Sequence, residues 1–589
     1  MIKYLLGINC CYHEDSAALL KNGKIVACVE QERFSRKRHT KFSMIDNSDI
    51  IPFEAIDFCL SKAGIKFRDV DLIGYTLDPY SRFMRNVEYE SPYPIPNGEW
   101  GTRDGELTFY SHNLNVIETL RNKYNSPVAR KFFFFEHQLC HAASAFYGSG
   151  FDDASVMVAD GIGEFATAWL GSGTRHSGLT CLKRINFPNS LGMFWDRIVE
   201  FCGFHYYDSS HLMGLSAYGK RSPFLEKMRH LLMADDKNLL ILDPKILRFR
   251  EERRTPEFSV SKSDFFDYLE EYLGVPPRNP KDEIKQCYRD IAFAAQTVLE
   301  ERLLYIVNWL YNKTKYDNLC YAGGIALNCV ANAKIINGSP FKKLWVQPAA
   351  NDAGTSLGAA YLLHHMIVGY NNSQHMNHSY WGPSFEKSDI KKEIVNCGFK
   401  FSEFAADDLV FEVATILRSN KIVAWFQGRM EWGPRALGNR SILANPQIEK
   451  VHDIINKKIK YREWFRPLCP SVLAEKASEW FDIPEGGETP AEYMLVACQV
   501  KKNKIERIPA VVHVDGSARI QIVRKSVNPL FHKLIKRFDD MTGTPLLLNT
   551  SFNIREPMVC TPKDALSTFI NSSMDVLCIG PFIIHKDGR

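Results

Sequence analysis

The sequence has no long apolar run, no large excess of one charge and no secretory leader pattern. No apolar run approaches the roughly 18 residues that a membrane-spanning helix requires, so we expect no membrane partner. The formal net charge is only +5 over 589 residues, which gives no indication of a nucleic-acid partner. The N-terminal residues lack the basic-then-apolar order of a signal peptide. We therefore expect a cytoplasmic protein.

The fifteen cysteines also lack a pattern, because none of them forms a CxxC pair and their spacing is irregular. Regularly paired cysteines are typical of zinc sites and of small disulfide-rich domains. Their absence argues against both frameworks and predicts reduced thiols. We interpret the adjacent Cys10 and Cys11 as the buried end of a strand rather than a redox pair.

The length and composition instead indicate a globular protein of more than one domain. A chain of 589 residues is too long for one hydrophobic core, and 45% hydrophobic with 24% charged residues is ordinary for a globular chain. A polar stretch rich in Gly and Asn, near residues 365–385, is typical of a domain boundary. We predict domains at residues 1–370 and 371–589, without solenoid-type repeats.

Two segments of the N-terminal half share a strand–turn–strand pattern. Residues 19–32 predict a hairpin around Asn22-Gly23, a favoured tight-turn pair. Residues 154–173 repeat this order, with Asp160 where the first strand ends. Paired hairpins over a nucleotide cleft resemble the actin-like, sugar-kinase-type ATPase architecture. The predicted fold class is therefore α/β, with an actin-like N-terminal domain.

A metal site is predicted from two histidines and two aspartates. His137 and His141 lie one turn apart in a predicted helix, so their imidazoles share one face. Asp160 and Asp352 lie at a strand end and before a predicted helix. Two nitrogen and two oxygen ligands suit iron, manganese or zinc, and ligand type alone does not choose among them. The alternative is one core and one solvated histidine.

ATP binding is predicted at glycine-rich turns of the N-terminal half. Gly323 and Gly324 follow a predicted strand and open a helix near Asn328, where a backbone without Cβ atoms can approach a base or ribose. Asp15 follows the first strand, at a place where such folds contact phosphates, and Gly161 after Asp160 is a further cofactor-binding candidate. The alternative is that the glycines of the strand–helix turn serve the geometry of the turn alone. ATP brings Mg²⁺ as a further candidate ion.

The second half carries basic side chains in turns and at strand edges rather than along a solvated helix face. Guanidinium groups bind phosphate and carboxylate through two parallel hydrogen bonds. Each of these residues alone is interpreted as an ordinary surface cation. As a set they indicate a pocket that binds a polyanion. The set is Arg435, Arg440, Lys460, Arg466 and Arg519, together with Asn549 and Ser551.

Ten strings, in order from near the N-terminus to near the C-terminus, carry a family resemblance. They are EQERFSRKRH, HQLCHAASAFY, VADGIGE, SLGMFWD, LMGLSAYGK, YAGGIALNCVAN, NDAGTSLGAAY, GRMEWGPRALGNRSILA, FRPLCPSVL and LLLNTSFN. The chain resembles the O-carbamoyltransferases of nodulation-factor and antibiotic pathways, such as those acting on tobramycin, cephalosporins and novobiocin-type compounds. The string GRMEWGPRALGNRSI is the most specific of them.

The resemblance implies an N-terminal domain similar to the tRNA threonylcarbamoyl-transferase fold and a C-terminal domain similar to the threonylcarbamoyl-adenylate synthetase fold. It implies that the four His and Asp ligands hold a metal, usually iron. It also implies that the cationic set holds carbamoyl phosphate and ATP. Two departures are present. The string His13-Glu14-Asp15-Ser16 stands where the family often has His-Asp-Ser, so either Glu14 replaces the usual Asp or one residue is inserted, and His211 stands where Lys is common.

The implied reaction moves a carbamoyl group onto a hydroxyl of a small-molecule natural product, such as an antibiotic or toxin. The C-terminal domain makes carbamoyl-adenylate from carbamoyl phosphate and ATP, with Arg435, Lys460 and Arg466 as catalytic residues. The N-terminal domain then transfers the carbamoyl group, with His13 as the candidate general base. A structural hydrogen bond at a strand end is the alternative for His13. The oligomeric state stays open, with a homodimer as one option.

Three other functions are alternatives to O-carbamoyl transfer to a small molecule. A tRNA threonylcarbamoyl-type enzyme would share both folds, but the charge shows no long basic stripe. A non-catalytic nucleotide-binding regulator would share the fold, but the full set of ligands and cations argues against loss of catalysis. A hydrogenase-maturation carbamoyltransferase would share the chemistry, but the sequence lacks an acylphosphatase-like start and zinc-finger cysteine pairs.

Overall fold

The computed structural model of the chain describes residues 3–89, 95, 97–247, 264–369 and 373–586. Its contacts form two compact units. Unit 1 comprises Met1–Gln31 and His39–Met376, and unit 2 comprises Glu32–Arg38 and Asn377–Arg589. The chain therefore passes from one unit to the other three times. The predicted boundary between residues 370 and 371 lies outside the described residues.

Unit 1 is built from two five-stranded sheets with the same strand order. In each sheet three consecutive strands pair antiparallel, and two later strands run parallel to the first of them. The first sheet has β1 (Tyr4–Asn9), β2 (Ser16–Lys21), β3 (Lys24–Glu30), β4 (Leu72–Tyr75) and β5 (Phe132–Phe134). The second has β6 (Asp153–Ala159), β7 (Ala166–Thr174), β8 (Gly178–Asn186), β11 (Asn318–Ala322) and β12 (Lys343–Val346).

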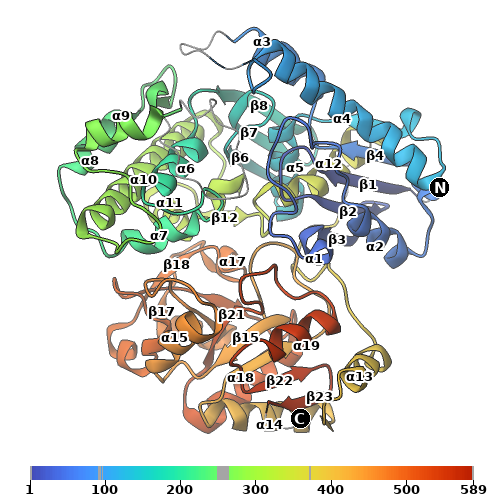
Figure 1. Cartoon of the computed structure of the whole chain (residues 1–589), viewed down its shortest axis with the longest axis vertical. Coiled ribbons are helices and arrows are strands. Elements are labelled where there is room, and N and C mark those ends of the chain that lie inside the picture. The colour runs from blue at the N-terminus through green and yellow to red at the C-terminus, as the bar shows by residue number, and fades with distance from the viewer. Residues whose placement is uncertain (1–2, 90–94, 96, 248–263, 370–372, 587–589) are drawn as a thin grey trace. The chain divides into compact units, whose positions relative to one another are not determined.

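Each half of this duplicated arrangement ends in a helix that packs against the sheet of the other half. Helix α5 (His137–Ser149) follows β5 but contacts β6, β7 and β11. Helix α12 (Thr355–Leu362) follows β12 but contacts β1, β2 and β4. The two helices also pack on each other (Figure 1). This duplication confirms the predicted α/β class with an actin-like first domain.

Glycines allow the close approach of α12 to its neighbours. A methyl group at Gly7 of β1 would lie 1.8 Å from the carbonyl oxygen of Ser356. A methyl group at Gly358 would lie 1.8 Å from the carbonyl oxygen of Cys140 in α5. Real Cβ contacts are far longer than this, so any larger residue at either position would force the elements apart. Gly358 therefore sets the distance between α12, which begins just after Asp352, and α5, which carries His137 and His141, while Gly7 sets the distance between α12 and β1.

Local signals predicted several elements correctly. The hairpin β2–β3 turns at Asn22 and Gly23, both with positive φ. The apolar spacing predicts a helix over residues 289–313, and helix α10 spans Gln286–Thr314. The helix predicted around the two histidines is α5. No helix in the described ranges is long and apolar enough to cross a membrane.

Further helices of unit 1 surround the sheets. They are α2 (Phe53–Ala63), α3 (Pro79–Val87), α4 (Arg103–Tyr124), α6 (Leu191–Phe201), α7 (Ser210–Ser216), α8 (Phe224–Leu231), α9 (Asp264–Leu273) and α11 (Cys329–Gly338). A two-stranded sheet of β9 (Leu232–Met233) and β10 (Ile241–Leu242) accompanies them.

Unit 2 contains an eight-stranded mixed sheet and a smaller three-stranded sheet. The large sheet runs in the order β13 (Ser402–Glu403), β23 (Phe582–His585), β22 (Val576–Ile579), β14 (Val423–Phe426), β15 (Arg440–Ala444), β21 (Leu546–Ser551), β16 (Cys469–Leu473) and β20 (Gln521–Val523). The small sheet has β17 (Phe481–Asp482), β18 (Ala497–Val500) and β19 (Ser517–Arg519). The helices are α1 (Glu32–Ser35), α13 (Lys387–Asn396), α14 (Ala406–Arg418), α15 (Lys450–Ile454), α16 (Ala477–Trp480), α17 (Glu488–Ala491), α18 (Pro529–Thr542) and α19 (Pro562–Ile570).

Helices α14 and α18 cover one face of the large sheet with a buried apolar core. Apolar side chains of both helices, such as Val413 in α14, form one buried cluster with the strand residues Trp425 and Leu547. Alternate residues of a strand share a face, so Asn549 and Ser551 continue the face that carries Leu547. The polar end of β21 therefore lies just beyond the apolar core.

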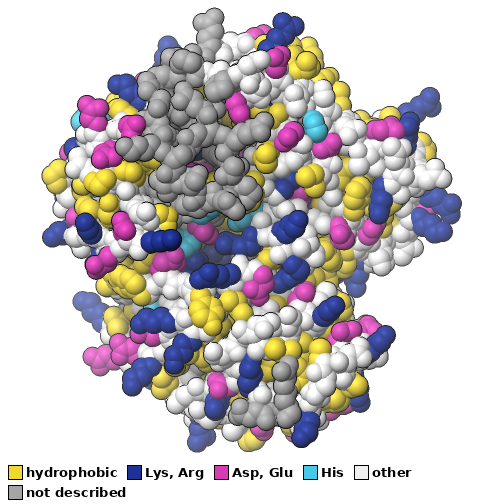
Figure 2. Space-filling model, viewed as in Figure 1, with side chains coloured by type: hydrophobic (Ala, Val, Ile, Leu, Met, Phe, Trp, Pro, Cys, Tyr) yellow, Lys and Arg dark blue, Asp and Glu magenta, His cyan; other side chains and the backbone are white. Residues whose placement is uncertain are grey.

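Figure 2 shows acidic and basic side chains interspersed on the face that it draws, in keeping with the small net charge.

Candidate functional site

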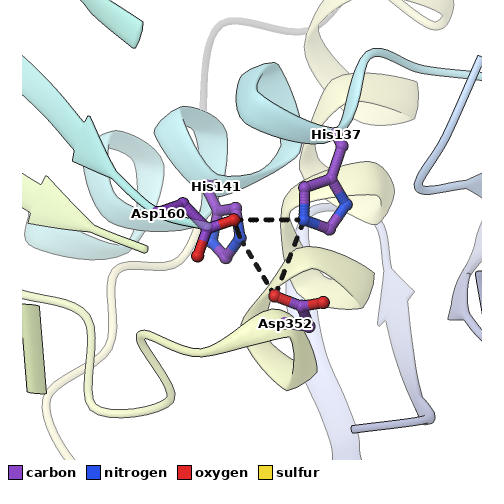
Figure 3. Close-up of side chains that lie close together, drawn as sticks. All are labelled: His137, His141, Asp160 and Asp352. Atoms are coloured by element: carbon purple, nitrogen blue, oxygen red, sulfur yellow. Dashed lines mark ion pairs between the residues drawn. The ribbon is translucent and has the colours of Figure 1, made fainter. Parts of the chain in front are cut away.

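The four predicted metal ligands converge on one point within unit 1 (Figure 3). His137 and His141 come from the first turns of α5, Asp160 follows β6, and Asp352 lies just before α12. The Nε2 atoms of both histidines lie 3.6 Å from Asp352 Oδ1 and 3.7 Å from Asp160 Oδ2. All four side chains are buried.

The spacing and bonding of these atoms fit a bound cation. A tetrahedral ion with ligands at about 2.1 Å would hold its ligand atoms about 3.5 Å apart, close to the distances seen here. Among the described residues, Nε2 of His137 and Nε2 of His141 have no hydrogen-bond partner although they are buried. Buried polar atoms normally have a partner, so two such nitrogens facing two carboxylates fit a shared metal ion. The donor set suits iron, manganese or zinc.

Neighbouring groups fix the orientation of the first histidine. His137 Nδ1 lies 3.0 Å from the carbonyl oxygen of Thr76, and as a donor to it would leave the Nε2 lone pair facing the aspartates. The carboxylate of Glu164 accepts the backbone N–H of His137 at 2.9 Å and that of Asp78 at 2.8 Å. These contacts anchor the first turn of α5, which carries the ligand.

The charges in the cluster compensate one another. Burial lowers the pKa of His137, but the carboxylates of Asp352 and Asp160 outweigh it and raise that pKa well above its usual range. Burial raises the pKa of Asp352, but His13 and His137 outweigh it and hold that pKa well below the usual range. The two carboxylates thus stay ionised in the interior. They are ready to balance a divalent cation in place of protons.

His13, the candidate base, lies beside this centre. Its Nε2 is 3.9 Å from Asp352 Oδ2, and its side chain is 27% exposed, so it is reachable by a substrate. The next two residues face elsewhere. Glu14 pairs with His39, and Asp15 is fully buried 3.5 Å from the Lys41 ammonium. Asp15 therefore has a buried ion-pair partner, and its part in phosphate binding stays a prediction.

The predicted nucleotide-binding glycines gather around Asp160. Gly324 donates its backbone N–H to Asp160 Oδ1 at 3.0 Å. A methyl group at Gly323 would lie 2.3 Å from the Ala159 carbonyl oxygen, whereas one at Gly161 would meet open space. Asn328 caps α11 through its side chain, which accepts the N–H of residue 331. Gly324 thus contacts the candidate ligand Asp160, and the binding of ATP by these glycines stays a prediction.

The departure at His211 has a structural account. His211 is 5% exposed, and its Nδ1 lies 2.7 Å from the Asp208 carbonyl oxygen. Its ring also stacks on Phe204 with centroids 5.2 Å apart. These contacts hold the imidazole in the interior of unit 1 at the start of α7.

A second candidate site lies at the polar end of β21 in unit 2. Lys460 is 3% exposed and donates to the carbonyl oxygen and hydroxyl of Ser551 and to Asn553 Oδ1. Asn549 donates to Ser471 Oγ at 2.9 Å, while its own Oδ1 is buried without a hydrogen-bond partner among the described residues. The buried Lys460 ammonium thus contacts Ser551 at the end of β21, and the lone acceptor Asn549 Oδ1 belongs to the same strand two residues earlier.

Like charges crowd this site. Burial is the largest cause that lowers the pKa of Lys460 well below its usual range, and Arg462 and Arg466 lower it further. Burial likewise lowers the pKa of Arg462 to about 9, with Arg466 and Arg519 adding to the shift. Buried cations that repel one another are costly without a counter-charge. The cluster is therefore suited to a polyanion.

The other predicted cations of unit 2 take different places. Arg440 is fully buried, donates to the carbonyl oxygens of Gln427 and Pro383, and lies over the ring of Phe426. These contacts give it a structural role, so its part in cofactor binding stays a prediction. Arg435 lies half-buried in the loop between β14 and β15.

Sequence reasoning missed two members of the unit 2 site and one anchor of the metal centre. Arg462 and Asn553 belong to the cluster, and Glu164 holds the start of α5. A signal for the first two was present, because Lys-x-Arg at 460–462 and Ser-x-Asn at 551–553 each place two polar side chains two residues apart. Glu164 offered no such signal, because its partner is a backbone N–H far along the chain.

Fold and site together define a two-unit α/β protein with an actin-like first unit, a buried His/Asp centre and a cation-rich second unit. The chain belongs to the carbamoyltransferase family. The family model for the carbamoyltransferase N-terminus matches residues 4–361, and that for the carbamoyltransferase C-terminus matches residues 414–586. It is therefore a transferase whose family moves carbamoyl groups.

Relatives match along nearly the whole chain. The Synechocystis protein sll1178 is 36% identical, over 100% of this chain and 97% of that protein. The nodulation protein NolNO of Sinorhizobium fredii is 32% identical, over 98% and 79%. The nodulation protein U of Rhizobium tropici is 28% identical, over 92% and 89%.

Solved structures show weaker likeness. HypF of T. kodakarensis is 12% identical over 63% of this chain and 48% of that chain, with a TM-score of 0.32. The ROK hexokinase of Thermus thermophilus is 12% identical over 61% and 98%, with a TM-score of 0.28. These likenesses are too weak to support a functional conclusion.

Proposed function

We propose that the chain is an ATP-dependent O-carbamoyltransferase that activates carbamoyl phosphate in unit 2 and transfers the carbamoyl group in unit 1. The observation that carries this proposal is the buried Lys460 with the half-buried Arg462, Arg466 and Arg519 around it, a set of like charges that suits a polyanion. Carbamoyl phosphate and the triphosphate of ATP are such anions. Membership of the carbamoyltransferase family indicates that the transferred group is a carbamoyl group.

In unit 2 the first step is hydrolysis of carbamoyl phosphate to carbamate and phosphate. A carbamate oxygen then attacks the α-phosphorus of ATP, forming carbamoyl-adenylate and releasing pyrophosphate. Lys460 and the arginines stabilise the charge on the transferring and leaving oxygens. The lone Oδ1 of Asn549 can accept a hydrogen bond from the carbamate NH₂ group.

In unit 1 an acceptor hydroxyl attacks the carbamoyl carbon and AMP leaves, which gives the O-carbamoyl product. His13 takes the hydroxyl proton, since its partly exposed imidazole lies next to the metal ligand Asp352. His137, His141, Asp160 and Asp352 hold a divalent metal, which supplies a Lewis acid for the carbonyl or phosphate oxygens. Thr76 and Glu164 keep the first of these ligands oriented.

The first test supplies the full chain with ATP and carbamoyl phosphate and follows pyrophosphate and AMP. We expect release of both that depends on carbamoyl phosphate, and Lys460→Ala should lower it by at least about a hundredfold because a charged group leaves the site. Release that requires threonine and tRNA instead would favour the tRNA-modifying alternative. No turnover with a broad acceptor panel would favour a non-catalytic regulator.

The metal centre is tested by His137→Ala, with the exposed His176→Ala as the matched control. We expect His137→Ala to lose bound metal, measured by elemental analysis, and to lose carbamoyl transfer while pyrophosphate release in unit 2 persists. His176→Ala should keep both. Full transfer by metal-free His137→Ala would contradict the role of the centre.

A further inference from the structure

Residues 32–38 belong to unit 2, although the residues on either side belong to unit 1. In the helical turn α1, Arg33 is 4% exposed and its Nη1 donates to Glu32 Oε1 at 2.6 Å. Phe34 packs against a buried cluster of Met430, Ala436, Met558 and Cys560. A short piece of the N-terminal half is thus built into the interior of the C-terminal unit.

Arg33 holds the middle of the loop that carries a predicted catalytic residue. Its Nη2 donates to the Gly433 carbonyl oxygen at 3.0 Å, two residues before Arg435. Two residues of the same loop region, Glu431 and Arg440, hold the two ends of this loop. Arg440 donates to carbonyl oxygens at its start, and Glu431 accepts backbone N–H groups near its end. Between these two anchors Arg33 supplies one contact, beside the hydrogen bonds that Trp432 N–H donates to the Ser379 carbonyl oxygen and that Asn549 donates to the Ala436 carbonyl oxygen.

Arg36 holds a second loop of the same site. Its Nη1 donates to the Met558 carbonyl oxygen at 2.7 Å and its Nη2 to the Pro557 carbonyl oxygen at 2.6 Å. These carbonyl groups follow closely after Asn553, which accepts from the ammonium of Lys460. The guanidinium fork thus fixes the chain just beyond the polar end of β21.

We propose that Arg33 and Arg36 are positioning residues of the unit 2 anion site, holding the Gly433–Arg435 loop and the loop after Asn553 in their anion-binding conformations. The proposal rests on the proposed function of that site. Charged donors to buried carbonyl groups are among the stronger hydrogen bonds, and removing one leaves its partner unpaired in the interior. Loss of either arginine should therefore loosen one loop without removing a group that touches the substrate.

The test uses the full chain and the carbamoyl-phosphate-dependent release of pyrophosphate. We expect Arg33→Ala and Arg36→Ala each to raise KM for carbamoyl phosphate about tenfold, with kcat changed by less than about threefold. Arg33→Lys, which keeps a charged donor, should recover part of the loss. The matched control is Lys37→Ala, which removes an exposed charge from the same segment and should leave KM unchanged.

Amide hydrogen exchange of the same proteins without ligand separates this proposal from the proposed function. We expect faster exchange confined to residues 429–440 in Arg33→Ala and to residues 553–560 in Arg36→Ala. Unchanged exchange in both loops would overturn the proposal, and so would a general rise across unit 2, since the segment would then serve overall stability. If the unaltered chain releases no pyrophosphate, the proposed function fails. The hydrogen-exchange result then decides by itself whether Arg33 and Arg36 hold the two loops.

Discussion

Lys460 is held among like charges in the interior of unit 2, and this has a consequence for its protonation. Burial, then Arg462 and Arg466, lower the pKa of its ammonium well below the usual range. A bound polyanion favours the charged ammonium and would raise that pKa again. The free and bound sites therefore differ in the number of protons that they hold.

Anion binding should accordingly take up a proton at pH values between the free and the bound pKa of Lys460. The affinity for pyrophosphate should rise as the pH falls through this range and level off below the pKa of the free site. Calorimetry in two buffers of different ionisation enthalpy measures the uptake. Lys460→Met, which removes the titrating group at similar size, should take up fewer protons, and equal uptake by both proteins would contradict the assignment.

The Glu14–His39 pair sets a pH dependence of stability in unit 1. Burial raises the pKa of Glu14, but the His39 charge and its hydrogen bond outweigh this and lower it to about 2. A carboxyl whose folded pKa lies below its unfolded value stabilises the fold above the unfolded pKa, and this stabilisation is lost as the pH falls toward 2. Part of the acid sensitivity of unit 1 therefore belongs to the turn that carries His13.

At the scale of elements, the candidate metal centre depends on how closely two helices approach. Helix α5 supplies both histidines and α12 begins just after Asp352. The contact of Gly358 with the Cys140 carbonyl oxygen leaves no room for a side chain between the helices. The ligand geometry is thus set by a backbone contact several residues away from the ligands.

Gly358→Ala should push α5 and α12 apart, lower the free energy of unfolding by about 1–3 kcal/mol and weaken metal binding. The matched control is Gly148→Ala in α5, where a methyl group would meet its nearest atom at an ordinary 3.4 Å. Thermal unfolding and metal titration measure the two effects. If both variants bind metal equally well, the helix spacing does not set the ligand geometry.

The sequence predicted those elements whose signals are local. The Asn22-Gly23 turn requires positive φ at two successive residues, and the spacing of His137 and His141 requires only one helical turn. No local sequence pattern predicts that α5 and α12 each pack against the sheet of the other half, because this packing depends on contacts between distant segments. Arg462 was missed although the Lys-x-Arg spacing at 460–462 was a signal, because only the folded site shows that its side chain lies among the other cations.

At the scale of the whole molecule, the two units are joined by more than the linker after Met376. Residues 32–38 leave unit 1 and return to it, and Arg33, Phe34 and Arg36 are anchored within unit 2. Sequence pattern places a boundary only where composition changes, as in the polar stretch before unit 2. The excursion is short and charged, which is why no change in composition marks it.

A protease site inserted between Met376 and Asn377 tests this connection. After cleavage the two fragments should stay together in size-exclusion chromatography, because the segment remains packed in unit 2. A cleaved variant with Arg33, Phe34 and Arg36 all changed to Ala should release them. Co-elution of the fragments of this variant would show that other contacts hold them.

The same excursion has a consequence for biosynthesis. Arg33 and its partner Gly433 lie 400 residues apart in the chain, and Arg36 and Met558 lie 522 apart. At a translation rate of about 5–20 residues per second, the first of these contacts waits about 20–80 s for its partner to be made. During that time a newly made segment with an apolar Phe34 has no place to bury it. Completion of the second unit is therefore tied to a segment made about 400 residues earlier.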